Sequence, residues 1–196
     1  MSFDFWRCFF SGLHGFFEQL QLDRLTQTLV IWPYMAVKTQ VENNYLEFKK
    51  SSIHNYGAFA KKPIAKGVRI IEYIGRPLTK KKAQKELDDG NAYVFTINKH
   101  FDIDGSVEWN PARFINHGCD TNAESDILKD RVWIIATRNI KKGEEVLYNY
   151  NYDLVDAFDN PCNCGSENCV GYMVDVEFWP KLRKMVAKRD KKNLLR

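Results

Sequence analysis

The chain has 196 residues and a mass of 23.0 kDa, with 44% hydrophobic residues, 28% charged residues and a formal net charge of +4. This length suits one compact globular domain with short extensions. The longest apolar run, Leu29 to Val37, contains Pro33 and falls short of the roughly 20 residues of a membrane-spanning helix. The amino terminus also lacks the basic start of a signal peptide. We therefore expect a soluble protein with no membrane partner.

The first 44 residues carry an aromatic-rich stripe. It lies at helical spacing within residues 3–20 and consists of Trp6, Phe9, Phe10, Leu13, Phe16, Phe17 and Leu20. This spacing predicts a helical extension over residues 1–44. Its apolar face would pack on the chain's own domain or, alternatively, form a homodimer or partner surface. Lys and Arg are scarce there, which disfavours binding to a membrane surface.

Short β-like runs separated by turn residues follow from Tyr45 onward. The runs span residues 46–50, 68–74, 92–97, 100–103, 132–137 and 145–150, and the turns include Lys66-Gly67, Asp104-Gly105 and Lys142-Gly143. One internal helix is predicted from Thr79, as its cap, to Leu87, with Gly90 beyond its end. The pattern predicts a mostly β domain of small sheets with short helices.

A cysteine-rich loop follows the last of these runs. Cys162, Cys164 and Cys169 have the spacing C-x-C-x4-C, which is a poor disulfide framework in a chain of five cysteines. Thiolates this close in sequence favour tetrahedral zinc, and they indicate a reducing, intracellular compartment. A fourth ligand is needed. Cys8 or Cys119 would close a structural site, whereas a catalytic zinc would hold water at that position.

The carboxyl-terminal end of the chain is basic. Residues 178–196 contain eight Lys or Arg against Asp190, a net charge of +7, which leaves residues 1–177 at −3. The run from Lys181 to Lys192 makes nucleic acid a candidate partner, through the tail itself or through a zinc-finger module on the neighbouring cysteines. The alternative is a solvated helix face. The mildly acidic body suits a basic peptide substrate.

Four sequence blocks carry a resemblance to a known protein family. In chain order they are Ile53 to Ala60 (IHNYGAFA), Glu72 to Gly75 (EYIG), Tyr93 to Phe95 (YVF) continued by Arg113 to Cys119 (RFINHGC), and Gly143 to Tyr150 (GEEVLYNY). Together with the cysteine triplet, these blocks resemble the SET-domain protein-lysine methyltransferases with a post-SET zinc loop. The likeness runs from about Tyr45 to Met173.

The resemblance implies a mostly β, β-clip-like SET-domain fold in which small sheets surround a pseudoknot, with terminal helices. In such a fold the segment ending in Tyr150 threads under a loop near Asn116, which brings Cys119 beside the cysteine triplet. The implied metal ligands are then Cys119, Cys162, Cys164 and Cys169. The implied domains are an N-terminal helical extension (1–44), a SET domain (45–153), a post-SET zinc loop (154–174) and a basic C-terminal tail (175–196).

The same resemblance implies S-adenosylmethionine-dependent methylation of a protein lysine, with histone tails as substrate and mainly monomethyl-lysine as product. The implied catalytic residues are Tyr150, Tyr148 and Tyr93, and Tyr148 lies where Tyr or Phe tends to set the number of methyl groups. The implied cofactor contacts are His54, Tyr56, Tyr93, Asn116, His117 and Asn163. The alternative is a catalytically weak SET-like module that binds lysine-containing peptides or partners.

Several positions depart from the family pattern. Asn55 stands where glycine is usual, and because Asn tolerates positive φ better than other non-glycine residues, we expect the turn to form. The other departures are Gly118 for Ser, Trp109-Asn110-Pro111 for Gly-Asn-Ala, and Asp120-Thr121-Asn122 for a Pro-Asn ending. We expect these to alter cofactor affinity and substrate fit and to leave the reaction class unchanged. The expected location is the nucleus or chromatin if the chain is eukaryotic or a host-directed effector, and otherwise the cytoplasm.

Overall fold

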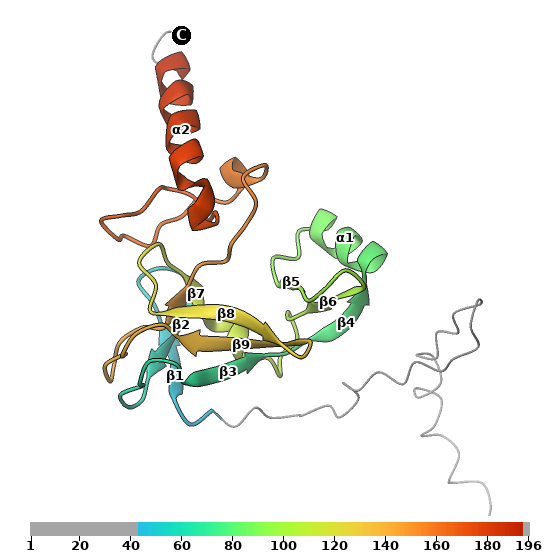
Figure 1. Ribbon diagram of the computed structural model, residues 1–196, viewed down its shortest axis with the longest axis vertical. Coiled ribbons are helices and arrows are strands. Elements are labelled where there is room, and N and C mark those ends of the chain that lie inside the picture. The colour runs from blue at the N-terminus through green and yellow to red at the C-terminus, as the bar shows by residue number, and fades with distance from the viewer. Residues whose placement is uncertain (1–42, 194–196) are drawn as a thin grey trace, which may run out of the picture. The chain divides into compact units, whose positions relative to one another are not determined.

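The computed structural model describes residues 43–193. Cys8 and all but the last two residues of the predicted N-terminal helical extension (1–44) therefore lie outside the described residues. Within residues 43–193 the chain is mostly β-strand with two α-helices, which confirms the predicted fold class (Figure 1). Neither of these two helices has the length and apolar character needed to cross a membrane.

The strands of the described part form four small sheets. The first pairs β1 (Leu46–Lys50) with β2 (Tyr56–Ala60), and the second has the order β3 (Arg69–Tyr73), β9 (Arg131–Ala136), β8 (Ala123–Leu128). The third has the order β4 (Arg76–Thr79), β6 (Phe101–Asp104), β5 (Val94–Thr96). Neighbours in these three sheets are antiparallel. The fourth sheet pairs β7 (Asn116–His117) with β10 (Leu147–Tyr148) in parallel.

Strand β9 shows why these segments form a layered core. Val132, Ile134 and Ala136 are buried, and the residues between them are only half-buried. Successive side chains of a strand point to opposite faces, so this alternation puts one face of β9 against the core. Each fully buried Val or Ile contributes about 1.5–3 kcal/mol to folding relative to an exposed position.

Helix α1 (Lys80–Asp88) confirms the internal helix predicted from the sequence. The Thr79 hydroxyl accepts a hydrogen bond from the backbone N–H of Lys82 at 3.4 Å, which is the expected N-cap contact. Gly90, with φ of 89°, lies just past the helix end. The helix packs beside β4 and β6 and buries Ala83 (Figure 1).

The chain after β10 forms a second, smaller core. It passes through two 3-10 turns, η2 (Ala157–Asp159) and η3 (Val176–Phe178), into helix α2 (Trp179–Asn193). Four buried residues of this region pack together, namely Leu154, Ala157, Val174 and Leu182. Leu182 belongs to the first half of α2, so this cluster fixes the base of the helix. Figure 1 shows the last turns of α2 extending away from the sheets.

Candidate active site

Two segments that are far apart in sequence pair at the centre of the site. Strand β7, which follows the 3-10 turn η1 (Pro111–Phe114), runs parallel to β10, with Asn116 opposite Leu147 and His117 opposite Tyr148. The backbone N–H of Gly118 also donates to the Tyr148 carbonyl at 3.3 Å. We call this pairing the crossing. It brings the predicted residues Asn116, His117 and Tyr148 into one place.

Asn122 locks the crossing from the side of β10, a role that was not predicted. Its side chain is buried, and its amide nitrogen donates to the Glu145 carbonyl at 2.7 Å and to a carboxylate oxygen of Glu144 at 3.0 Å. Its amide oxygen accepts from the backbone N–H of Leu147 at 2.9 Å. A buried amide with its donors and its acceptor all used is a strong structural constraint. Asn122 therefore fixes the start of β10.

Asn116 ties the crossing to the loop that precedes β2. Its amide nitrogen donates to the Tyr56 carbonyl at 3.0 Å, to the His54 carbonyl at 3.4 Å and to a Glu145 carboxylate oxygen at 2.9 Å. The other carboxylate oxygen of Glu145 accepts from the Ser51 hydroxyl at 2.9 Å. The residues predicted to contact the cofactor in this loop are thus held beside those predicted in β7.

The backbone of this loop has the shape expected from its sequence. Asn55 has φ of 36°, which confirms the positive value predicted for the residue that replaces glycine. Gly57 is required for packing, because a Cβ there would lie 2.1 Å from a carboxylate oxygen of Glu145. His54 is exposed and Tyr56 is 51% exposed, so both rings are accessible to a ligand.

Three tyrosines from β10 and the residues after it stand ring to ring. The ring centroids of Tyr148 and Tyr150 lie 5.0 Å apart, and those of Tyr150 and Tyr152 lie 5.8 Å apart. The Tyr150 hydroxyl donates to the Ile115 carbonyl at 3.0 Å. The Tyr148 side chain is only 6% exposed. Burial, and then the neighbouring tyrosines, raise the pKa of Tyr148 and Tyr150, so both hydroxyls keep their protons at neutral pH.

His117 links Tyr150 to Cys119. Its Nδ1 accepts the backbone N–H of Tyr150 at 3.2 Å, so the ring proton of the neutral imidazole lies on Nε2, which is 3.7 Å from the Cys119 sulfur. Burial lowers the pKa of His117 to about 4, which keeps the ring neutral. Both ring nitrogens are therefore engaged within the protein. The ring of His117 therefore has no nitrogen left for a further hydrogen bond.

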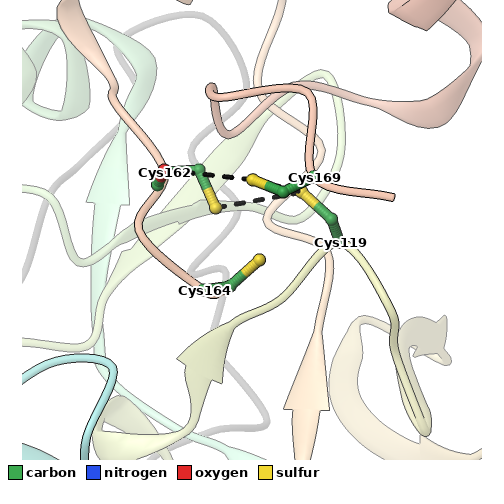
Figure 2. Close-up of side chains that lie close together, drawn as sticks. All are labelled: Cys119, Cys162, Cys164 and Cys169. Carbon is green, nitrogen blue, oxygen red and sulfur yellow. Dashed lines mark hydrogen bonds between the residues drawn. The ribbon is translucent and has the colours of Figure 1, made fainter. Parts of the chain in front are cut away.

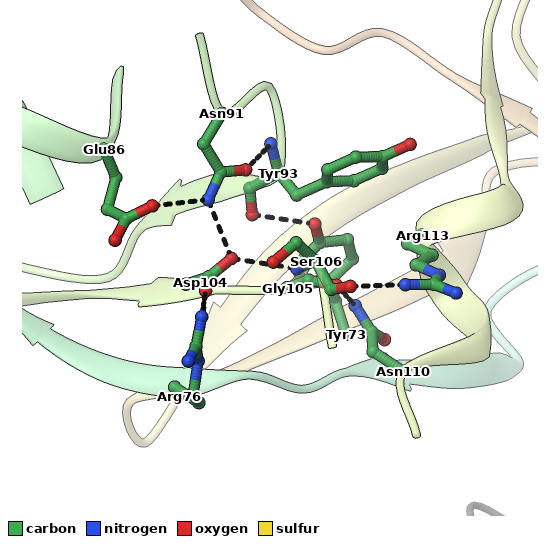
Figure 3. Close-up of polar contacts among 10 residues, drawn as sticks. All are labelled: Tyr73, Arg76, Glu86, Asn91, Tyr93, Asp104, Gly105, Ser106, Asn110 and Arg113. Carbon is green, nitrogen blue, oxygen red and sulfur yellow. Dashed lines mark hydrogen bonds and ion pairs between the residues drawn. The ribbon is translucent and has the colours of Figure 1, made fainter. Parts of the chain in front are cut away.

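Tyr73 belongs to the same group of tyrosines, although it was not predicted as a site residue. It ends β3, is buried, and its hydroxyl donates to the Tyr93 carbonyl at 2.9 Å (Figure 3). The Gly105 N–H donates to the same carbonyl at 2.9 Å, and a Cβ at Gly105 would lie 2.3 Å from the Tyr73 hydroxyl. Tyr93 itself is 41% exposed. Tyr73 could have been identified from the sequence, because it lies at a strand end inside the block Glu72 to Gly75.

Asp104 fixes the other side of Tyr93 through Asn91. Its side chain is 0% exposed and accepts from the Asn91 amide at 3.0 Å, the Ser106 N–H at 2.9 Å and the Arg76 guanidinium at 2.5 Å (Figure 3). The Asn91 amide oxygen in turn accepts the backbone N–H of Tyr93 at 3.0 Å. Burial alone raises the pKa of Asp104, but these hydrogen bonds outweigh it and lower the pKa to about 2.

Replacement of Asp104 by Asn is expected to destabilise the protein at neutral pH by about 2–3 kcal/mol, because hydrogen bonds to a charged acceptor are lost. The folded pKa lies below the ordinary value of about 3.9, so the stabilisation is complete above pH 4 and is lost as the pH falls toward 2. Urea unfolding at several pH values checks this. The exposed residue Asp126, replaced by Asn, serves as the control and should unfold as the wild type does at every pH.

Four cysteine sulfurs meet where the crossing contacts the loop after β10. The Cys119 sulfur lies 3.8 Å from that of Cys162 and 3.7 Å from that of Cys169, and these three sulfurs and that of Cys164 lie within 4.8 Å of one another. Figure 2 shows the four side chains turned toward a common centre. Sulfurs about 2.3 Å from a tetrahedral zinc ion are about 3.8 Å apart, so the spacing fits zinc.

The chemistry of the four thiols also fits a cation. Burial raises the pKa of Cys119 to about 12, and neighbouring Cys164 and Cys169 add to the shift. Burial acts in the same sense on Cys164, but hydrogen bonds from Ser166 and backbone groups lower its pKa to about 6. Four thiolates this close repel one another unless a positive ion lies between them. The predicted residue Asn163 lies exposed in the same loop.

A comparison with protein families found a model that matches this chain. The family model described as "SET domain" matches residues 55–151, which contain the crossing, Tyr148 and Tyr150. The chain belongs to the SET-domain family. The SET match ends at residue 151, so the cysteine triplet lies beyond it. Tyr73, Asp104 and Asn122, which were missed in the sequence, all lie inside it.

Curated relatives of this SET domain have names that include a reaction. Histone-lysine N-methyltransferase 2D of Homo sapiens is 34% identical over 150 residues, which cover 71% of this chain and 3% of that protein. Histone-lysine N-methyltransferase set-2 of Caenorhabditis elegans is 36% identical over 138 residues, covering 65% and 9%. The variant-silencing SET domain-containing protein of Plasmodium falciparum (isolate 3D7) is 39% identical over 142 residues, covering 65% and 6%. The chain thus spans less than a tenth of each of these relatives.

Proposed function

We propose that the chain is an S-adenosylmethionine-dependent protein-lysine N-methyltransferase that acts on histone tails and forms mainly monomethyl-lysine. The observation that carries the proposal is the pair Tyr148 and Tyr150, which stand ring to ring at the crossing inside the SET match. The names of the relatives support the reaction class and the histone substrate. The proposed site residues are those predicted from the sequence, with Tyr73 added.

The reaction needs a neutral amine. A lysine side chain with a pKa of about 10.4 is neutral in roughly one molecule in a thousand near pH 7. When bound, S-adenosylmethionine supplies an electrophilic methyl group on a positively charged sulfonium. Desolvation among the tyrosine rings, together with that positive charge, disfavours the ammonium form of the substrate lysine. The proton is then lost to solvent before transfer.

Tyr150 is the proposed catalytic tyrosine. Because its hydroxyl donates to the Ile115 carbonyl, the oxygen lone pairs remain free to accept weak C–H hydrogen bonds from the electron-poor methyl group. The rings of Tyr73, Tyr93 and Tyr148 would guide the aliphatic stem of the lysine. Alignment of this kind supplies about 7–11 kcal/mol when the reacting atoms are held about 3–3.5 Å apart.

The donor would lie against the loop that precedes β2 and against β7. His54 and Tyr56 offer an imidazole and a ring face, and Asn116 holds the carbonyls of both residues in place. The exposed ring of Tyr93 would cover the donor from the other side. These residues provide polar and aromatic contacts for a ligand with an amino-acid end and an adenine end.

Zinc would be held by Cys119, Cys162, Cys164 and Cys169, with a structural role. The crossing supplies one ligand and the loop supplies three, so the ion would fasten this loop to the crossing. Asn163 lies between two of the ligands and would then form one wall of the donor site. No open coordination position is needed for this role.

Tyr148 is proposed to limit the product to monomethyl-lysine. Its side chain is buried beside the Tyr150 ring, where the hydroxyl would bind the substrate amine or a water that crowds it. Replacement of Tyr148 by Phe removes this group and is expected to shift the product toward dimethyl- and trimethyl-lysine. Mass spectrometry of a methylated histone peptide gives the distribution. A distribution equal to that of the wild type would refute the role of this hydroxyl.

The proposed activity is tested by incubating the full chain with isotopically labelled S-adenosylmethionine and mixed histones. We expect label in histone lysines, located by mass spectrometry, and none in heat-denatured controls. Absence of transfer to the histones, and to ribosomal proteins assayed in parallel, would favour the alternative of a non-catalytic SET-like module. Binding of lysine-containing peptides without transfer would establish that alternative.

The cellular setting follows from the proposed substrate. An enzyme that modifies histone tails acts in the nucleus or on chromatin, which is our proposal for this chain. A homodimer through residues 1–44 stays a prediction, because those residues lie almost wholly outside the described part. Nucleic-acid contact through the basic tail also stays a prediction from the sequence.

A further inference from the structure

Helix α2 carries four lysines in a single row. Lys181, Lys184, Lys188 and Lys191 are spaced three, four and three residues apart, and all four side chains are exposed. With 3.6 residues per turn, this spacing keeps them on one side of the helix. We call these four residues the lysine row. Its ends are ten positions apart, so the row is about 15 Å long.

The opposite side of α2 is buried against the body. Leu182 is 0% exposed, and Met185 and Val186 pack on the same small core. Arg189, also on this side, places its guanidinium 4.6 Å from the ring centroid of Phe158. The lysine row therefore faces away from the protein. Because the apolar face of α2 is already covered, the helix has none left to insert into a lipid bilayer.

The charge of the row is not neutralised by the protein. Helix α2 holds seven Lys or Arg against Asp190 alone, and no ion pair that the structure shows within residues 43–193 involves α2. Asp190 lies one or two residues from Lys191 and Lys188, and side chains at these spacings do not face each other on a helix. Adjacent lysines of the row are three or four residues apart, where like charges repel by about 0.2–0.5 kcal/mol per pair.

We propose that the lysine row binds the phosphate backbone of duplex DNA. A B-form duplex carries one negative charge per about 1.7 Å of its axis, so a row about 15 Å long faces a regular array of charges of matching extent. The row holds no aromatic side chain on which unpaired bases could stack, which favours a duplex over a single strand. Lysines without base-reading groups bind phosphates independently of sequence. If the proposed histone activity holds, this contact would orient the enzyme on DNA-wrapped histones.

The test measures binding of a fluorescently labelled duplex to the full chain by anisotropy across a series of salt concentrations. Four phosphate contacts predict a slope of log affinity against log salt of about −3.6. Replacement of Lys181, Lys184, Lys188 and Lys191 by Gln should weaken binding at low salt by about tenfold or more and remove most of that slope. Circular dichroism and thermal unfolding show whether α2 remains folded in the variant.

The matched control removes the same charge elsewhere. Lys66, Lys81, Lys99 and Lys142, all exposed, are replaced by Gln, and this variant should bind the duplex nearly as the wild type does. Equal loss of duplex affinity in both variants, or unchanged affinity in the row variant, would overturn the proposal. Displacement of the duplex by a short polyglutamate of equal charge would also overturn it. Activity on a free histone peptide is a separate readout. The wild type and both variants are assayed in this way. If none of them methylates the peptide but the lysine row is still required for DNA binding, the DNA-binding proposal is supported and the proposed enzyme activity is refuted.

Discussion

Replacement of Tyr150 by phenylalanine is expected to lower kcat for methyl transfer by about 100- to 1000-fold, the usual cost of removing one oriented polar group from a transition state. The hydroxyl is oriented by the Ile115 carbonyl, so its lone pairs have a fixed direction that phenylalanine cannot supply. The ring contacts with His117 and Tyr148 are retained in the variant. Initial rates with labelled donor and a saturating histone peptide measure the effect.

Folding must be separated from chemistry in this variant. Loss of one hydrogen bond to a backbone carbonyl should cost about 1 kcal/mol of stability, which thermal unfolding will show. Tyr172 provides a matched control, because its ring packs edge-on against Phe158 at 5.2 Å, in the small core after β10. Tyr172→Phe should turn over at close to the wild-type rate. A fully active Tyr150→Phe enzyme would exclude this hydroxyl from the reaction.

Loss of zinc is the second large expected effect. Chelation, or replacement of Cys119 by Ser, should remove the ion and reduce transfer to background, because binding energy of a structural zinc, on the order of 10 kcal/mol, is also folding energy. The physical link to the chemistry is short. Cys119 lies 3.7 Å from Nε2 of His117, and Nδ1 of that ring accepts the backbone N–H of Tyr150. Loss of order at the metal site would therefore also disturb the position of the catalytic tyrosine.

The measurement combines metal analysis with hydrogen exchange. Zinc content should fall in Cys119→Ser, and exchange should rise in the cysteine loop while β3, β8 and β9 stay protected. Cys8→Ser is the matched control, since it removes a thiol of the same kind and should keep both zinc and activity. Added zinc should restore the chelated wild type. Full activity in a verified zinc-free preparation would show that the reaction does not depend on the metal.

Local features of this chain could be predicted from the sequence because a few neighbouring residues determine them. The cap at Thr79 and the positive φ at Asn55 follow from the chemistry of single residues, and the structure shows both. The spacing of Cys162, Cys164 and Cys169 indicated a metal cluster for the same reason. The crossing was inferred only through the resemblance, since nothing local predicts that β10 pairs with β7.

Contacts across the fold could not be predicted in this way. Asn122 was noted only as a departure from the family pattern, yet it holds the start of β10 through contacts with residues more than twenty positions away. Asp104 looked like part of a turn, but its carboxylate anchors Asn91 and, through it, Tyr93. The basic tail was evident in the sequence. The side of α2 that faces solvent emerges only once Leu182 is seen to be buried.

A crystal structure of the full chain with S-adenosylhomocysteine and a lysine-containing histone peptide tests the central claim most directly. We expect the donor sulfur and the substrate nitrogen to approach each other beside the Tyr150 hydroxyl, with the methyl position between them and zinc bound by the four cysteines. Donor bound far from Tyr150, or a peptide lysine that does not reach the tyrosine group, would contradict it.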